Sequence, residues 1–321
     1  MTLDLRIVLS ELVTQYRVRR SDISVATMTI VVFFEEPTIG ELARNRIRTL
    51  ASKHPSRVIV LDGTQDASLH RVEADDWIEL GAKATGAESL RSAVGVLRIP
   101  DAPVVLLWIA RGIAGDPRFA MLSEHVATIV YNSSLLDVGH DALCELVEYV
   151  EQHPRLPVAD IAYLRLAPWQ ESVAIFFDGP EIGELFKLRR VEIACGSEPE
   201  AFYLLGWMAS RLQWTPYASN ALLNRQGERI EFEIRREGEP RRIQRVALSS
   251  GHSDFVAQVD ERAETIQLSV TGSSRHPQRF RPINNPGIAA LVERAILWGH
   301  NDRIFHDSLA AAGRVLSRVE G

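Results

Sequence analysis

The stretch LPVADIAYLRLAPWQESVAIFFD, residues 156–178, separates two parts of the chain that have different patterns of secondary structure. Pro154 and Pro157 indicate a connection between two helical patterns, so we place a domain boundary between residues 155 and 156. Asp160 is a predicted helix N-cap. The apolar residues that follow recur at the spacing of one helix face: Trp169, Val173, Phe176 and Phe177. The stretch contains no nucleophile, general base or set of metal ligands, so it predicts packing rather than catalysis.

Residues 1–155 alternate short apolar runs with helical patterns. The predicted strands are 25–34, 57–61, 72–80, 104–109 and 126–131, and the predicted helices are 5–16, 39–51, 89–97 and 142–152. Short, continuously apolar strands separated by helices indicate a mostly parallel sheet with helices on both faces. We therefore expect a Rossmann-like, three-layer α/β domain over residues 1–155.

Residues 156–321 follow a different pattern. A predicted strand at 188–194 precedes a helix at 200–212 that is apolar on nearly all sides, which indicates burial. Apolar and polar residues then alternate through 230–234, 246–248, 255–259 and 266–270, as is typical of an antiparallel meander with one face in water. Two predicted helices, 286–298 and 302–318, close the chain. We expect an α+β domain over residues 156–321.

Length, charge and hydropathy argue against several classes of protein. The chain has 321 residues, 46% of them apolar, and a formal net charge of −6, so it can bury a large core but lacks the basic surface that nucleic-acid binding requires. No stretch reaches the roughly 18–20 apolar residues of a membrane helix, and the first residues lack the pattern of a signal peptide. We expect a cytoplasmic protein. Cys144 and Cys195 are too few for a disulfide framework or a zinc site, and we interpret them as buried thiols.

Four segments contain chemically suggestive residues, and each has a simpler interpretation. Residues 81–88 have the glycine spacing of a phosphate loop without its lysine, and Glu-Glu-Pro at 35–37 stands where a dinucleotide-binding glycine motif would follow the first strand. The run Ser-Gly-His-Ser-Asp at 250–254 cannot supply a converging triad from one strand. In the cluster at 300–307, only Asp302 and His306 share a helix face, and Asp302 is a predicted helix cap. The sequence predicts no catalytic residue, cofactor or metal site.

Three arginine pairs allow two interpretations: Arg189-Arg190, Arg235-Arg236 and Arg241-Arg242. Their guanidinium groups could clamp a sugar phosphate, or they could form the exposed faces of sheet strands. Among the tryptophans, Trp169 and Trp207 lie in apolar helical patterns and are predicted core residues. Trp214 lies in the loop-like segment 213–217, which predicts an exposed side chain.

Four segments resemble, in order, the motifs of one known family. The stretch 156–178 resembles the signature of the OpcA family, the assembly and activator proteins of glucose-6-phosphate dehydrogenase. Three others resemble further motifs of that family: HPSRVIVL at 54–61, which follows the strand-like run at 26–32, PDAPVVLLW at 100–108 and FYLLGWMASRL at 202–212. Beyond about residue 212 the resemblance is weak. Ser56 stands where the family motif has a cysteine, which puts any redox control through that position in doubt.

The resemblance implies a non-catalytic protein that binds glucose-6-phosphate dehydrogenase and favours its active oligomer in the oxidative pentose phosphate pathway. The competing hypothesis is a sugar-phosphate- or nucleotide-binding enzyme that uses the arginine pairs of the C-terminal domain. Five residues are named as candidates for partner binding: Trp214, Tyr217, Arg189, Arg190 and Arg165. The sequence does not predict the chain's own oligomeric state.

Overall fold

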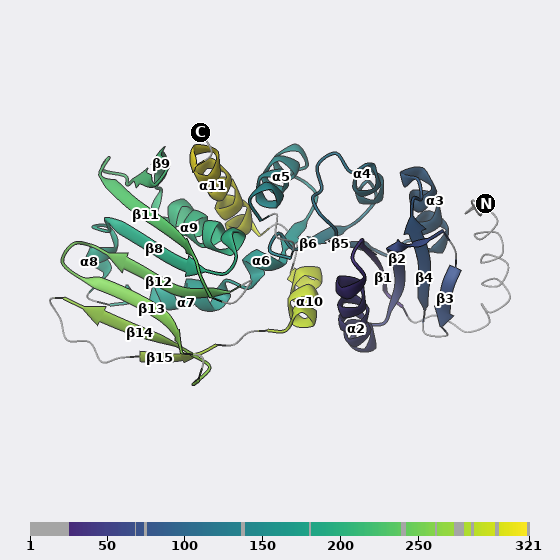
Figure 1. Cartoon of the computed structure of the whole chain (residues 1–321), viewed down its shortest axis with the longest axis horizontal. Helices are drawn as coiled ribbons and strands as arrows, with labels where there is room; N and C mark the ends of the chain where they lie inside the picture. Colours follow the sequence, from purple (N-terminus) through teal and green to yellow (C-terminus); the bar gives the residue numbers. More distant parts are fainter. Residues whose placement is uncertain are drawn as a thin grey trace. The chain divides into compact units, whose positions relative to one another are not determined.

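The computed structural model describes residues 26–67, 69–73, 76–135, 139–179, 181–238, 242–260, 262–272, 279–283, 286–298 and 302–319 (Figure 1). The helix predicted at 5–16 lies outside these residues. Contacts divide the chain into two compact units. Unit 1 comprises Met1–Asn132, Tyr149–Asp160 and Gly287–His300, and unit 2 comprises Ser133–Glu148, Ile161–Pro286 and Asn301–Gly321. The single boundary between residues 155 and 156 stays a prediction.

Unit 1 contains a seven-stranded sheet in the order β3-β4-β2-β1-β5-β6-β7. The strands are β1 (Met28–Phe34), β2 (Ser56–Asp66), β3 (Leu69–Glu73), β4 (Trp77–Lys83), β5 (Val104–Ile109), β6 (Thr128–Tyr131) and β7 (Val158–Asp160). β3 is antiparallel to β4, whereas all other neighbours are parallel. In β1 and β2 consecutive side chains are buried, so both faces of the sheet are covered. The predicted Rossmann-like α/β architecture is confirmed.

Two helices of this unit begin at a proline, which has no backbone N–H group. The helices of the unit are α2 (Pro37–Lys53), α3 (Ala87–Leu97), α4 (Pro117–Ser123) and α10 (Ile288–Trp298), while α5 (Gly139–Gln152) contributes residues to both units. Pro37 and Pro117 occupy the first turn of their helices, where an N–H group has no partner within the helix. Asp116 caps α4, since its side chain accepts hydrogen bonds from the N–H groups of Arg118 (2.8 Å) and Phe119 (3.4 Å).

The strand predicted at 72–80 and the domain expected for the helix at 286–298 were wrong. The single strand predicted at 72–80 is a pair of antiparallel strands, β3 and β4, because Asp76 takes a positive φ of 59° and begins the return. The helix predicted at 286–298 forms as α10, but it packs against α2 and β6 in unit 1 rather than in the α+β part. There His54 Nε2 lies 2.7 Å from Glu293 Oε1. Periodicity indicates an apolar helix face but not the sheet that it covers.

Unit 2 contains a mixed eight-stranded sheet in the order β15-β14-β13-β12-β8-β11-β10-β9. The strands are β8 (Arg190–Cys195), β9 (Thr215–Ala218), β10 (Ala221–Leu223), β11 (Arg229–Arg236), β12 (Ile243–Ser249), β13 (Asp254–Asp260), β14 (Thr265–Thr271) and β15 (Arg279–Pro282). Three strands of the predicted antiparallel meander, β12, β13 and β14, form it, and β15 extends it. The place predicted for residues 230–234 in this meander was wrong, because β11 runs parallel to β8, which sequence alternation alone does not predict.

The stretch 156–178 forms β7 and two short helices, α6 (Ile161–Leu164) and α7 (Ala167–Ile175). Asp160 is the last residue of β7 and directly precedes α6, so its role as a helix N-cap stays a prediction. The apolar face that follows is buried as predicted. The rings of Phe176 and Phe177 lie 5.6 and 4.8 Å from that of Phe255 on β13. The remaining helices are α8 (Ile182–Leu185), α9 (Glu198–Leu212) and α11 (Arg303–Val319). α9 packs against α11 and against the apolar face of β8 and β11.

Candidate functional surface

The face of the unit 2 sheet opposite α9 is lined by paired charges. In the register of β8, β11 and β12, Glu233 lies opposite Glu192, and Arg235 and Arg245 both lie opposite Ala194. We call this set the charged face: Arg190, Glu192, Glu233, Arg235 and Arg245. The side chains of Arg190 and Arg235 are 48% and 49% exposed, so solvent and a macromolecule can reach them.

Ion pairs link the members of the charged face. Arg190 Nε lies 2.7 Å from Glu192 Oε1, and its Nη2 lies 3.1 Å from Glu233 Oε2. Arg235 Nε lies 2.7 Å from Glu233 Oε1, and this hydrogen bond lowers the pKa of the Glu233 carboxyl. Arg245 Nη1 lies 3.4 Å from Glu192 Oε2. Three guanidinium groups thus share two carboxylates, so pairing neutralises much of the charge on this face.

The arginine pairs do not act as phosphate clamps in this arrangement. Arg189 directly precedes β8 and pairs outside the charged face, because its Nη2 lies 2.7 Å from Glu228 Oε1. Arg190 and Arg235 keep their own glutamate partners. Arg241 lies outside the described residues. The interpretation as exposed strand faces accounts for Arg189, Arg190 and Arg235.

The other candidate residues differ in exposure. Tyr217 on edge strand β9 is 58% exposed. The expected exposure of Trp214 was wrong, since its side chain is only 5% exposed. Gln213 takes a left-handed conformation (φ 57°) at the end of α9, and the Trp214 N–H returns to the Ala209 carbonyl at 2.9 Å, which folds the segment back. Arg165 is also an internal residue: its side chain is 14% exposed and pairs with Glu200, which is 2% exposed.

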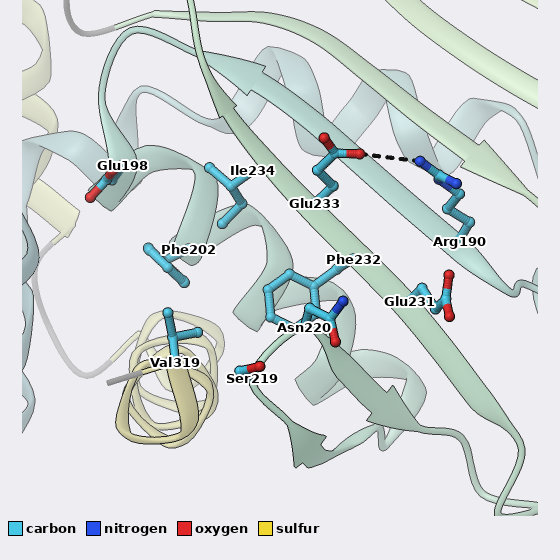
Figure 2. Close-up of a pocket in the computed structure, with 10 residues that line it drawn as sticks. All are labelled: Arg190, Glu198, Phe202, Ser219, Asn220, Glu231, Phe232, Glu233, Ile234 and Val319. Atoms are coloured by element: carbon cyan, nitrogen blue, oxygen red, sulfur yellow. Dashed lines mark hydrogen bonds and ion pairs between the residues drawn. The ribbon is translucent and has the colours of Figure 1, made fainter. Parts of the chain in front are cut away.

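A pocket of about 400 Å³ opens beside β11 (Figure 2). Phe202 of α9, Phe232 and Ile234 of β11 and Val319 of α11 converge on it, and the ion pair between Arg190 and Glu233 lies across the strand (Figure 2). The lining residues come from segments far apart in the sequence. No local motif could have predicted this pocket, and sequence reasoning missed it.

The chemically suggestive segments are structural where they are described. Ser250 Oγ donates to Glu184 Oε2 at 2.5 Å and accepts from the Ser253 N–H at 3.1 Å, so it holds a turn. Asp302 Oδ1 accepts from the N–H groups of Ile304 and Phe305 at 2.9 and 3.2 Å and is the predicted cap of α11. Among the residues that the structure describes, no group of three or more His, Cys, Asp or Glu side chains could hold a metal ion. Within the same residues, no helix is long and apolar enough to cross a membrane.

Comparison with protein families gives two matches in order along the chain. Residues 47–148 match the glucose-6-phosphate dehydrogenase subunit N-terminal domain, OpcA_G6PD_assem, and residues 156–309 match the corresponding C-terminal domain, OpcA_G6PD_C. The chain belongs to the OpcA family. The family's motif-like segments lie on β1, β2, β5, β7, α7 and α9, and their side chains are mostly buried. The OpcA motifs therefore identify the cores of both units rather than a contact surface.

Curated relatives carry the same family name. An OpcA protein of Synechocystis sp., named as an OxPP cycle protein, is 29% identical over 189 residues, which are 52% of this chain and 39% of the relative. That of Nostoc punctiforme is 31% identical over 144 residues, 44% of this chain and 30% of the relative. The matched segments thus span two fifths or less of the length of these OpcA relatives.

Solved structures share the fold at low sequence identity. The 3-ketoreductase KijD10 from Actinomadura kijaniata in complex with NADP gives a TM-score of 0.54 at 10% identity, over 91% of this chain and 96% of that chain. An aldose-aldose oxidoreductase from Caulobacter crescentus gives 0.52 at 11% identity, over 92% and 96%. At this identity, the likeness shows the fold of this OpcA-family chain alone.

Proposed function

We propose that this chain is a non-catalytic assembly factor and activator of glucose-6-phosphate dehydrogenase in the oxidative pentose phosphate pathway. The observation that carries the proposal is the ordered pair of matches to domains described as parts of a subunit of that dehydrogenase. The proposal places the chain in the cytoplasm together with its partner.

The proposed mechanism is a shift in population. A protein that binds the active oligomer of the dehydrogenase more tightly than the inactive form raises the active fraction. The shift cannot exceed the difference between the two binding free energies. No bond rearrangement by the chain itself is required.

The exposed surface of unit 2 supports a role in protein binding. Arginine suits protein interfaces, because its planar fork pairs with carboxylates and it is weakly hydrated. Arg190 and Tyr217 are exposed, so we keep them, together with Arg189, as contact candidates. Trp214 and Arg165 are held inside the fold, so in the proposed contact they act by shaping the surface.

The test uses the full chain and the purified glucose-6-phosphate dehydrogenase of the same organism. We expect the two proteins to co-elute in size-exclusion chromatography at micromolar concentrations, and we expect the rate of glucose-6-phosphate oxidation to rise. The chain alone should show neither turnover nor saturable binding of glucose 6-phosphate. Absence of both complex and activation contradicts the proposal, and turnover by the chain alone favours the competing enzyme hypothesis.

A further inference from the structure

The sheet of unit 1 has the strand order of a dinucleotide-binding domain. Its six parallel strands run β4-β2-β1-β5-β6-β7, and the order reverses between β1 and β5. In such sheets the ligand binds outside the carboxyl ends of the strands next to this reversal. The fold therefore implies a nicotinamide dinucleotide at the ends of β1 and β2, and the residues there decide whether it fits.

The position of the pyrophosphate carries negative charge. In dinucleotide-binding domains, a glycine-rich turn follows the first strand and leads into a helix whose free N–H groups hold the pyrophosphate. Here Glu35 and Glu36 follow β1, both exposed, and Pro37 begins α2 without an N–H group. Glu35 Oε1 lies 2.8 Å from Arg118 Nη1, but Glu36 makes no side-chain cap to the helix. A pyrophosphate would therefore meet two carboxylates beside a helix start that lacks one of its N–H donors.

A side chain fills the space above the first turn of α2. Phe34, the last residue of β1, is fully buried. Its ring packs so close to Gly40 that a Cβ atom at position 40 would lie only 2.2 Å from a ring carbon. Glycine at position 40 thus allows α2 to pack directly against the Phe34 ring. In dinucleotide-binding domains, glycines of the same turn let the backbone approach the ligand.

The carboxylate that would bind a ribose already has partners on both oxygens. Asp62 pairs with Phe34 in the sheet register, near the carboxyl end of β2. Its Oδ2 accepts from Arg44 Nη2 at 2.5 Å, and its Oδ1 accepts from the Thr64 N–H at 2.9 Å and from Thr64 Oγ1 at 2.6 Å. Both oxygens are engaged, which leaves poor acceptors for a sugar hydroxyl.

Arg44 links Asp62 on β2 to Glu79, which lies within β4. Its Nε donates to Glu79 Oε2 at 3.1 Å, and Glu79 Oε1 accepts from Trp77 Nε1 at 2.7 Å. The guanidinium carbon lies 4.7 Å from the centre of the Phe34 ring. One side chain of α2 therefore donates hydrogen bonds to Asp62, the carboxylate that a ribose hydroxyl would otherwise reach, and also stacks on the Phe34 ring.

We propose that Arg44 and Phe34 take the place of a dinucleotide at this end of the sheet, so that unit 1 keeps a Rossmann-like frame, binds no nicotinamide dinucleotide and depends on Arg44 for its stability. This inference does not depend on the proposed partner, because it concerns only contacts inside unit 1.

The binding half of the proposal is tested by titrating the full chain with NADPH and NADH. Ligand fluorescence should show no saturable signal up to about 1 mM, the upper end of ordinary KM values. A dehydrogenase known to bind NADPH serves as the positive control. Saturable binding of either dinucleotide overturns the proposal, whatever the outcome of the dehydrogenase experiments.

The stability half compares Arg44→Met with Arg46→Met, an exposed arginine on the same helix. Removing Arg44 leaves Asp62 and Glu79 without their shared cation, so we expect the midpoint of thermal unfolding to fall by at least about 5 °C. Arg44→Lys should give an intermediate loss, because it keeps the charge but not the fork. Failure of Arg44→Met to fold, with Arg46→Met folded, also supports the inference. Equal midpoints for the two methionine variants overturn it.

Discussion

At the scale of single residues, burial decides what an ion pair contributes. Arg165 pairs with Glu200 inside unit 2, whereas Arg189 pairs with Glu228 in solvent. Breaking a buried pair leaves an uncompensated carboxylate and costs about 3 kcal/mol or more, while an exposed pair contributes about 0–1 kcal/mol. We expect Arg165→Met to lower the free energy of unfolding in urea by that larger amount and Arg189→Met to change it little. Similar losses of unfolding free energy for both variants would show that the pair of Arg165 with Glu200 contributes no more than an exposed pair.

Asp62 makes stability depend on pH. Burial alone would raise the pKa of its carboxyl, but the hydrogen bonds from Thr64 and Arg44 outweigh burial and hold the pKa below its ordinary value of 3.8. A lowered pKa contributes stability that is present above the unfolded value and is lost as the pH falls through the folded value. We expect the wild-type chain to be more stable than Asp62→Asn at pH 6, and the difference should shrink below about pH 4. If the curves of unfolding free energy against pH for the wild type and Asp62→Asn run parallel, the prediction is contradicted.

Cys195 is a buried thiol in β8. Burial raises its pKa to about 12, so almost no thiolate forms near neutral pH. In a Cys144→Ser variant, where Cys195 is the remaining cysteine, we expect no reaction with a thiol reagent at pH 8 in native buffer. Complete reaction should follow in urea. Rapid reaction of the native variant would mean that β8 opens locally.

At the scale of elements, the sequence predicts what each segment is better than where it packs. Continuous apolar runs predicted β1, β2, β5 and β6 of unit 1, and the spacing of Trp169, Val173 and Phe176 predicted the buried face of α7. The partner of each face depends on contacts between distant segments, so the placement of α10 and the parallel pairing of β8 with β11 were not predictable. The burial of Trp214 was not predictable either, because it depends on the left-handed conformation of the preceding residue, Gln213.

The crossing of α9 and α11 depends on one glycine. A Cβ atom on Gly206 would lie 2.4 Å from the Ser308 carbonyl oxygen and 2.8 Å from the Ala312 nitrogen. We expect Gly206→Ala to destabilise the chain by about 1–3 kcal/mol, because backbone atoms of α11 would have to move. Gly95→Ala is the matched control, since no atom lies within 4 Å of that Cβ position in α3. It should stabilise the chain by about 0.5–1 kcal/mol in urea unfolding. Loss of stability in both variants would contradict a packing origin.

At the scale of the whole molecule, the residues that identify the family are mostly not those exposed on the surface. The motifs that identify the OpcA family form buried strands and helices, so they specify the two cores. A contact surface depends on which charged side chains of separate strands become neighbours. The sequence suggested Arg190 as a candidate, but it could not predict that Glu192 and Glu233 share its charge.

The charged face provides the last prediction. The double variant Arg190→Ala with Arg235→Ala removes two exposed arginines, and exposed ion pairs contribute little to stability, so the variant should keep its unfolding midpoint. If this face binds the dehydrogenase, association should weaken by about tenfold, mainly through a slower on-rate, and should depend less on salt. Arg314→Ala, an exposed arginine on α11, is the control and should bind as the wild type does. Surface plasmon resonance at two salt concentrations measures both affinities. If the double variant and the control bind equally well, the charged face is not the contact surface.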